Sequence, residues 1–272
     1  MISSRRNPLV RRLRELSSAK GRIQYSSLLL EGTHLLLEAL QTGARPSEIV
    51  ATPEWIEDNL ELLKRIPSQV KLNSVTQSVL QASLTTVNPN GVASIFPLSV
   101  LPQPSDQSNF VLALDRLQDP GNLGTLFRTA LAADVDLVWL ALGADPLGQK
   151  VLRSSAGAVL KLPFQRLGGA EKHSINELVE KLEKARKQGF QIVGTYSPNS
   201  CHVLAVSPYW ELDWTKPTVL VLGNEGDGVH PTIQDCCTHS VSLPHNQQVE
   251  SLNVASAAVP LLLERLRATM TS

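Results

Sequence analysis

The sequence has few cysteines and no long apolar run, and both absences limit what the protein can be. Its cysteines, Cys201, Cys236 and Cys237, are odd in number and two are adjacent, which suits neither a disulfide framework nor a zinc site. A reducing compartment is the simpler inference. No run of about 18 uninterrupted apolar residues exists, so no membrane span is predicted.

Several catalytic fingerprints are also missing. Neither GxGxxG nor a GxxxxGKS or GxxxxGKT loop occurs, which disfavours a nicotinamide dehydrogenase on a doubly wound fold and a phosphate-binding loop. No nucleophile elbow supports a Ser/His/Asp triad. The six histidines are scattered with no pair at metal-ligand spacing, so no metal site is expected.

Charge is unevenly distributed along the chain, although the formal net charge is zero. Residues 1–22 contain seven basic residues against Glu15 alone, so this end carries +6 and the remainder −6. Such asymmetry indicates an acidic partner for the N-terminal end, with nucleic acid as the main candidate. The basic, acid-poor start also matches an organellar transit peptide, and its residues alone leave both interpretations open.

Residues 1–98 alternate short strands and helices. A helix is predicted over residues 8–17, followed by the strand SSLLLEG and a helix with Thr33 as its N-cap and Gly43 as its stop. Pro53 is predicted at the first position of a further helix. This alternation implies a small α/β domain with a mainly parallel sheet and helices on its faces. A length of 272 residues, 42% of them apolar, suits two such domains.

Residues 99–109, which include two prolines, are predicted to be a linker. A second α/β domain is expected over residues 110–272, with strands VLALDRL, VDLVWLAL, FQIVGTY, TVLVLGNEG and SVSLP. KVLRSSAGAVL is expected to be helical, and LPFQRL to lead away from that helix. The clearest helix is SINELVEKLEKARKQG, with Ser174 and Glu177 at capping-box spacing and Gly189 as its stop.

The last helix of the chain differs from the others. Residues 243–266 pass from a polar loop into a helix whose first residues, Ser251 and Asn253, are polar, while those that follow are almost all apolar. Such a helix is predicted to be buried nearly all round. Its polar start either caps the exposed amides, with Ser251 as N-cap, or presents them to a ligand.

Three polar loops follow strands of the second domain, and together they predict a pocket. In open α/β sheets ligands bind beyond the carboxyl ends of the strands, so such loops can converge. His245 is predicted to be a wall of this pocket rather than a base. Each loop carries side chains that would be costly to bury without partners: Asn122 and Arg128, Asn224 and Glu225, Ser251 and Asn253.

The SpoU (TrmH-type) branch of the SPOUT methyltransferases has three successive motifs, and this sequence resembles them in DPGNLGTLFRTA, LVLGNEGDGV and LPHNQQVESLNVASA. Members transfer a methyl group from S-adenosylmethionine to a ribose 2′-oxygen of rRNA or tRNA. RSSAGAVLKLPF resembles their segment between the first two motifs. ISSRRNPLVRRLRELSSAKGR and LLLEGTHLLLEAL resemble the opening of their small α/β/α substrate-binding domain, which weighs against a transit peptide.

The resemblance implies roles for individual residues. Five match catalytic motif residues of the family: Asn122, Arg128, Glu225, Ser251 and Asn253. Four match positions where the backbone holds the cofactor: Leu222, Gly223, Leu243 and Leu252. RNA binding is expected at the basic start of the chain: Arg5, Arg6, Arg11 and Arg12.

The resemblance also implies an assembly. In the family the C-terminal α/β domain forms a deep trefoil knot and pairs as a homodimer, although knots are rare exceptions to the general rules of topology. An apolar final helix that needs more cover than one domain supplies is consistent with a partner subunit. Three residues depart from the family: His245 replaces Met, Gln247 replaces Gly, and Pro260 should kink or loosen the final helix unless packing compensates.

Arg128 is the residue on which the expected reaction depends. Because a guanidinium is almost never neutral in proteins, we expect Arg128 to orient a substrate phosphate rather than to act as a base. Asn122 and Ser251 would orient Arg128 and the ribose, while Glu225 and Asn253 hold the loops. We expect 23S rRNA as substrate, with guanosine a candidate target, and a cytoplasmic location. A tRNA methyltransferase and a non-catalytic RNA-binding protein are the alternatives.

Overall fold

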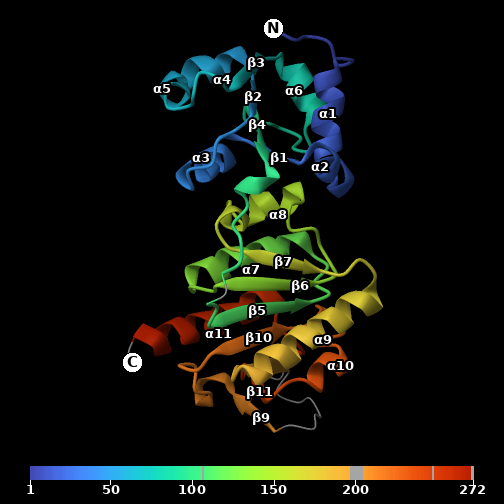
Figure 1. Cartoon of the computed structure of the whole chain (residues 1–272), viewed down its shortest axis with the longest axis vertical. Helices are drawn as coiled ribbons and strands as arrows, with labels where there is room; N and C mark the ends of the chain where they lie inside the picture. The colour runs from blue at the N-terminus through green and yellow to red at the C-terminus, as the bar shows by residue number, and fades with distance from the viewer. Residues whose placement is uncertain (106, 197–204, 247, 271–272) are drawn as a thin grey trace. The chain divides into compact units, whose positions relative to one another are not determined.

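The computed structural model describes residues 1–105, 107–196, 205–246 and 248–270 (Figure 1). It divides the chain into two compact units. The first unit consists of Met1–Pro102 and Asp145–Lys161, and the second of Gln103–Ala144 and Leu162–Ser272. Two residues singled out in the sequence, Cys201 and Gln247, lie outside the described residues, as does one of the six histidines, His202.

The first unit contains a four-stranded sheet in the order β1-β4-β2-β3. Strand β4 runs antiparallel to β1 and β2, and only β2 and β3 are parallel, so the prediction of a mainly parallel sheet is wrong here. The buried carboxylate of Glu31, at the end of β1, accepts the backbone N–H groups of Thr85 and Thr86 at 3.0 and 3.1 Å. These hydrogen bonds hold the segment that precedes β4 against the end of β1. The strands are β1 (Ser27–Glu31), β2 (Glu48–Ala51), β3 (Lys71–Ser74) and β4 (Val92–Pro97).

Helices lie on both faces of this sheet (Figure 1). In α1, Val10, Leu13 and Leu16 recur every three residues, and this apolar stripe packs into a core with Leu29 and Val50 of the strands. The helices are α1 (Pro8–Leu16), α2 (Ala19–Tyr25), α3 (Thr33–Gln41), α4 (Pro53–Asp58), α5 (Leu60–Lys64) and α6 (Gln77–Ser83), and a 3-10 turn, η1 (Leu98–Val100), follows β4.

The local signals in this unit are partly confirmed. Pro53 occupies the first turn of α4, and Gly43 follows α3 with a φ of 81°, as expected for a helix stop. Thr33 is not an N-cap, because α3 already begins there and Gly32 precedes it. The Thr33 hydroxyl instead accepts a hydrogen bond from Trp55 Nε1 at 2.8 Å. This tertiary contact replaces the predicted local one.

Segment Asp145–Lys161 packs with the first unit, although the sequence places it between the first two motifs of the second domain. Gln149 Nε2 donates to the Leu29 carbonyl at 2.9 Å, and Lys161 forms an ion pair with Glu38. Only part of the expected helix forms, as α8 (Gln149–Ser154) and the 3-10 turn η2 (Ala158–Leu160). A single boundary near residue 110 therefore does not account for the packing of this segment.

The second unit contains a seven-stranded sheet in the order β7-β6-β5-β10-β8-β11-β9, in which all neighbours are parallel. Both faces carry helices (Figure 1), as a parallel sheet requires. The strands are β5 (Phe110–Asp115), β6 (Leu137–Ala141), β7 (Phe164–Leu167), β8 (Gln191–Tyr196), β9 (Val206–Pro208), β10 (Thr218–Leu222) and β11 (His239–Ser242). The helices are α7 (Pro120–Ala132), α9 (Glu171–Lys187), α10 (Pro231–Gln234) and α11 (Val254–Met270), with a 3-10 turn, η3 (Tyr209–Glu211).

Two details of this unit correct the sequence predictions. LPFQRL contains the strand β7 rather than only a connection. Helix α9 begins three residues before Ser174, so the predicted capping box does not form. The buried Ser174 hydroxyl donates to the Leu167 carbonyl at 2.7 Å, and Glu177 accepts from Gly168 N at 2.7 Å. Gly189, with a φ of 89°, does follow the helix as its stop.

Helix α11 is buried on one side only. Ala255, Ala258, Leu261 and Leu262 are buried, whereas Val259 and Leu263 are 37% and 42% exposed, so burial nearly all round is wrong for a single copy. Pro260 lies within the continuous helix. None of the helices in the described ranges combines the length and the apolar character that crossing a bilayer needs.

Candidate active site

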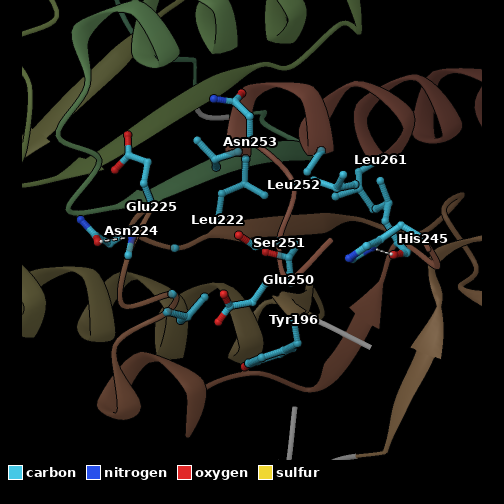
Figure 2. A pocket seen from close by; sticks show the side chains of 18 of the residues that line it. Tyr196, Leu222, Asn224, Glu225, His245, Glu250, Ser251, Leu252, Asn253 and Leu261 are labelled. Atoms are coloured by element: carbon cyan, nitrogen blue, oxygen red, sulfur yellow. Dashed lines mark hydrogen bonds between the residues drawn. The ribbon is translucent and has the colours of Figure 1, made fainter. Parts of the chain in front are cut away.

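The three polar loops of the second unit surround one cavity of about 1200 Å³ (Figure 2). It lies where β10 and β11 end, and the start of α11 completes its wall. All of the predicted catalytic and cofactor residues except Arg128 line it: Asn122, Glu225, Ser251, Asn253, Leu222, Gly223, Leu243 and Leu252. The predicted convergence of three loops is therefore present, and the roles of the individual residues stay predictions.

Hydrogen bonds connect one residue from each loop. Asn253 Nδ2 donates to Asn122 Oδ1 at 2.9 Å, and Asn122 Nδ2 donates to Glu225 Oε1 at 3.2 Å. Asn253 Oδ1 also accepts from Ala255 N and Ser256 N at 3.0 and 3.1 Å, so Asn253, and not Ser251, caps α11. The side chain of Asn122 is thus held at both its oxygen and its nitrogen between the other two loops.

Glu225 attaches the second loop to the first. Its carboxylate accepts the backbone N–H groups of Gln118 and Asp119, each at 3.2 Å. Burial alone would raise the pKa of this carboxyl, but hydrogen bonds from the backbone and from Asn122 outweigh burial, and the pKa lies below its ordinary value of 4.5. Glu225 therefore stays ionised at neutral pH and accepts these donors.

Replacing Glu225 with glutamine should lower the melting temperature at neutral pH by about 1 to 2 °C, because the residue is exposed and its hydrogen bonds are partly screened. Because the pKa of Glu225 is lower in the folded protein than in the unfolded chain, its carboxylate contributes its full stabilisation above about pH 4.5. This stabilisation is lost as the pH falls through the folded-state pKa. The difference between the variant and the native protein should therefore shrink as the pH falls below 4.5. Thermal unfolding followed by circular dichroism across pH 3 to 7 measures it, and a constant difference contradicts the assignment.

Gly223 permits a close backbone approach at the start of the second loop. A Cβ atom there would lie 2.2 Å from the Gly228 carbonyl carbon and 2.3 Å from Val229 N. Asn224 and Gly228 form an antiparallel bridge, with hydrogen bonds at 2.9 and 3.0 Å. The loop is therefore folded back on itself, with backbone rather than side chains beside Leu222 and Gly223.

His245 belongs to the wall of the cavity, as predicted from the sequence (Figure 2). Its Nδ1 donates to the Leu243 carbonyl at 2.7 Å, because a carbonyl oxygen only accepts. The ring is thus fixed to the backbone of its own loop. This contact fits a positioning role better than that of a mobile base.

Sequence reasoning missed Tyr196 and Glu250, which both line the cavity (Figure 2). Burial, and next the nearby Cys237, raise the pKa of Tyr196 above its ordinary value, so its phenol stays protonated. Tyr196 ends a strand that the sequence identified, and the rule that ligands bind at carboxyl ends of strands could have included it. Glu250 precedes the motif-three serine, and its acidic side chain was a further available signal.

Arg128 does not line the cavity of its own chain. It lies six residues after Asn122 on α7, which places the two side chains about 120° apart around the helix. Arg128 is exposed to solvent. Arg128 is therefore the one predicted catalytic residue that does not lie on this cavity, and its catalytic role stays a prediction.

The predicted RNA-binding arginines occupy different environments in the first unit. Arg5 and Arg6 are exposed. Arg11 Nε lies 2.8 Å from Glu15, and Arg12 forms an ion pair with the buried Glu48. Arg12 therefore connects α1 to β2, so Arg5 and Arg6 are the better placed pair for an external phosphate.

No cluster of three His, Cys, Asp or Glu side chains that could hold a metal ion occurs among the residues that the structure describes. Cys236 and Cys237 are buried, and burial raises the pKa of each thiol to about 11. Neither cysteine is therefore set up as a thiolate ligand at neutral pH.

The sequence matches two known families over most of its length. The SpoU rRNA Methylase family matches residues 109–262, and the MRM3-like substrate binding domain matches residues 7–94. The first match covers more than half of the chain and contains all three cavity loops. The chain belongs to the SpoU rRNA methylase family, and it is an RNA methyltransferase.

Similar proteins cover the chain from end to end. An uncharacterized tRNA/rRNA methyltransferase of Synechocystis sp. is 42% identical over 98% of this chain and 93% of its own length. The 23S rRNA (guanosine(2553)-2′-O)-methyltransferase RlmP of Bacillus subtilis is 29% identical over 96% of this chain and 97% of its own. The AdoMet-bound rRNA methyltransferase of Sinorhizobium meliloti has a TM-score of 0.77 and 27% identity, with 98% of this chain and 97% of that one covered.

The cavity fits S-adenosylmethionine, the cofactor of the family. Its volume slightly exceeds the roughly 300–1000 Å³ typical of small-molecule sites. Leu222, Leu252 and Leu261 provide apolar walls, and the backbone at Gly223 is free of a Cβ. Glu250 places an acidic group on the wall, which suits a cationic sulfonium. Bound here, the cofactor supplies the methyl group for transfer.

Proposed function

We propose that this protein transfers a methyl group from S-adenosylmethionine to a ribose 2′-hydroxyl of 23S rRNA, with guanosine as the first candidate target, in the cytoplasm. The observation that carries this proposal is the cavity bounded by all three motif loops. The Bacillus subtilis relative, named for 2′-O-methylation of a guanosine in 23S rRNA, supports the choice of substrate. A tRNA substrate is the alternative within the same chemistry.

In this proposal the residues of the chain position groups rather than form covalent bonds. Asn122, Glu225 and Asn253 hold the three loops in register through their mutual hydrogen bonds. Ser251, on the cavity wall, is assigned to the ribose. Arg128 is assigned to a substrate phosphate and to the charge that develops as the ribose proton leaves.

The active form is proposed to be a homodimer through the second unit, with the trefoil knot of the family. Val259 and Leu263, four residues apart on α11, present an exposed apolar strip that a second copy can cover. Helix α7 packs beside α11, so a partner seated on this strip lies close to α7 as well. We therefore place Arg128 in the site of the partner subunit.

RNA binding by the first unit is assigned to Arg5 and Arg6. Changing both to alanine should weaken binding to a 23S rRNA transcript and reduce the slope of log affinity against log salt by about 2, because each removed phosphate contact contributes about 1. Filter binding at several salt concentrations measures this slope. Lys64→Ala, at an exposed lysine of α5 already paired with Glu61, is the control and should leave it unchanged. An unchanged slope in the double variant would remove these arginines from the interface.

Two experiments test the proposed function. Calorimetric titration with S-adenosylmethionine should give heat, whereas a non-catalytic RNA-binding protein would give none. Ribose-methylation mapping of total RNA with and without the gene should show one lost 2′-O-methyl group. Loss of a site in tRNA would favour the alternative substrate, and loss of no site would reject the function.

A further inference from the structure

The end of β5 carries a pair of charged neighbours that do not line the cavity. Asp115 is fully buried and Arg116 has a side chain only 12% exposed. Arg116 Nε and Nη2 donate to the two carboxylate oxygens of Asp115, at 2.9 and 3.3 Å. Burying a carboxylate is costly unless it is paired and hydrogen-bonded, so this position needs a reason beyond packing.

The pair contacts both ends of the loop that forms one wall of the cavity. Asn224 Nδ2 donates to the Arg116 carbonyl at 2.8 Å. His230 N donates to Asp115 Oδ2 at 2.7 Å. Between these two anchors the chain passes from Asn224 through Val229, and all of that stretch lines the cavity. The ends of the wall are therefore fixed by two residues that do not themselves line the cavity.

Arg116 adopts a backbone conformation that side chains rarely take. Its φ is 54°, in the left-handed region, and such residues persist only where the surroundings hold them. Arg116 N donates to the Ala141 carbonyl at 2.8 Å, and the Leu117 carbonyl accepts from Ala144 N at 2.8 Å. The end of β6 thus holds this segment on the side opposite the loop, with the Arg116 carbonyl directed to Asn224.

The guanidinium of Arg116 also lies near the middle of the loop, between the two hydrogen bonds that hold the ends of the loop. Its Nη1 lies 3.9 Å from Asp227 and 3.7 Å from Glu171 of α9. The hydrogen bond with Asp115 is the main cause that raises the pKa of Arg116, against the effect of burial. Arg116 is therefore a permanent positive charge paired with the Asp115 carboxylate, which also accepts from His230 N.

We infer that Asp115 and Arg116 are positioning residues that hold the loop from Asn224 to His230 in the conformation that binds the methyl donor. The inference rests on the proposed function, because it concerns the same cavity. A loop that was not ordered in the free protein would have to become ordered when the donor binds. That ordering would reduce the net free energy of binding. With both ends anchored to β5, that ordering is complete in the free protein.

Calorimetric titration of full-length variants with S-adenosylmethionine tests this inference. Asp115→Asn should raise the Kd for the donor by about 10-fold to 100-fold, because a buried donor or acceptor loses its partner. At saturating donor the kcat of this variant should stay within about threefold of the native value, and the loss of activity should appear as a raised KM for the donor. Arg116→Gln should raise the Kd similarly, and Arg116→Lys, which keeps the charge, should recover part of it.

The matched control is Asp136→Asn, just before β6, which alters contacts at the opposite end of β5. Asp136 Oδ2 accepts Asn109 N and Phe110 N, at 2.7 and 2.8 Å, where β5 begins. This variant should unfold at a lower temperature and bind the donor with an unchanged Kd. It therefore separates loss of stability from loss of loop order.

The outcomes distinguish the two proposals. Heat from the native protein with an unchanged Kd in Asp115→Asn and Arg116→Gln would overturn the positioning role and leave the proposed function intact. No heat from the native protein would overturn both. If Asp115→Asn does not fold, Arg116→Gln and Arg116→Lys decide the question by themselves, since both keep the buried carboxylate. A raised Kd in Asp136→Asn equal to that of Asp115→Asn would also reject the inference.

Discussion

Replacing Arg128 with alanine is expected to reduce methyl transfer by about 10³-fold and to leave the Kd for S-adenosylmethionine within about twofold. The first effect follows because removal of one group that stabilises developing charge typically slows the chemical step by roughly 10²- to 10³-fold. The second follows because Arg128 is assigned to a phosphate of the RNA rather than to the methyl donor, and it does not line the cavity of its own chain. Single-turnover transfer to a 23S rRNA transcript and calorimetry measure the two quantities.

Lys184→Ala, at an exposed cation on α9, is the control for general loss of positive charge and should transfer normally. Turnover of Arg128→Ala at the native rate would reject the catalytic assignment. Arg128→Lys should recover little activity, since an ammonium lacks the planar, two-pronged geometry of a guanidinium. Substantial rescue by lysine would mean that only charge is required.

The same variant can show whether two chains share a site. An inactive Arg128→Ala chain retains its cavity, and an inactive chain with a damaged cavity retains Arg128. Random mixing of the two should restore about a quarter of native activity, because about half of the dimers are mixed and each has one complete site. No recovery in a mixture shown to exchange subunits would place Arg128 outside the partner's site.

Replacing Gly223 with alanine is expected to raise the Kd for S-adenosylmethionine by at least about 100-fold. The added Cβ would lie 2.2 to 2.5 Å from backbone atoms of Gly228 and Val229, whereas non-bonded carbon atoms prefer about 3.5–4.0 Å. The opposing atoms are backbone, so no side-chain rotation relieves the contact. The bridge between Asn224 and Gly228 must shift, and the wall of the cavity shifts with it. Calorimetry with the cofactor gives the Kd directly.

Two further glycines control for this substitution. Gly169→Ala has no atom within 4 Å of the new Cβ and should leave binding unchanged. Gly226→Ala, in the same loop, has its nearest contact at 3.5 Å and should lose far less affinity than Gly223→Ala. If all three variants bind the donor like the native protein, the close approach at Gly223 has no part in cofactor binding.

Most local features of the structure could be predicted from the sequence. The α/β alternation of the second unit, the glycine stops after α3 and α9, and the loops that follow β5, β10 and β11 were all predicted from apolar runs, capping residues and turn residues. These features depend on neighbours a few positions apart. Eight of the nine catalytic and cofactor candidates lie on the cavity for the same reason, since they sit in those loops.

The order of the strands was decided only by the tertiary structure. Strand β10 pairs with β5, which brings Asn224 to Arg116 across 108 residues of sequence. The antiparallel β4, the packing of Asp145–Lys161 with the first unit and the position of Arg128 outside the cavity were also unpredictable from local patterns. Apolar periodicity determines which face of an element is buried, whereas the partner that buries it depends on contacts between distant segments. The residues alone therefore specified the loops and their chemistry, and long-range packing specified which side chains meet.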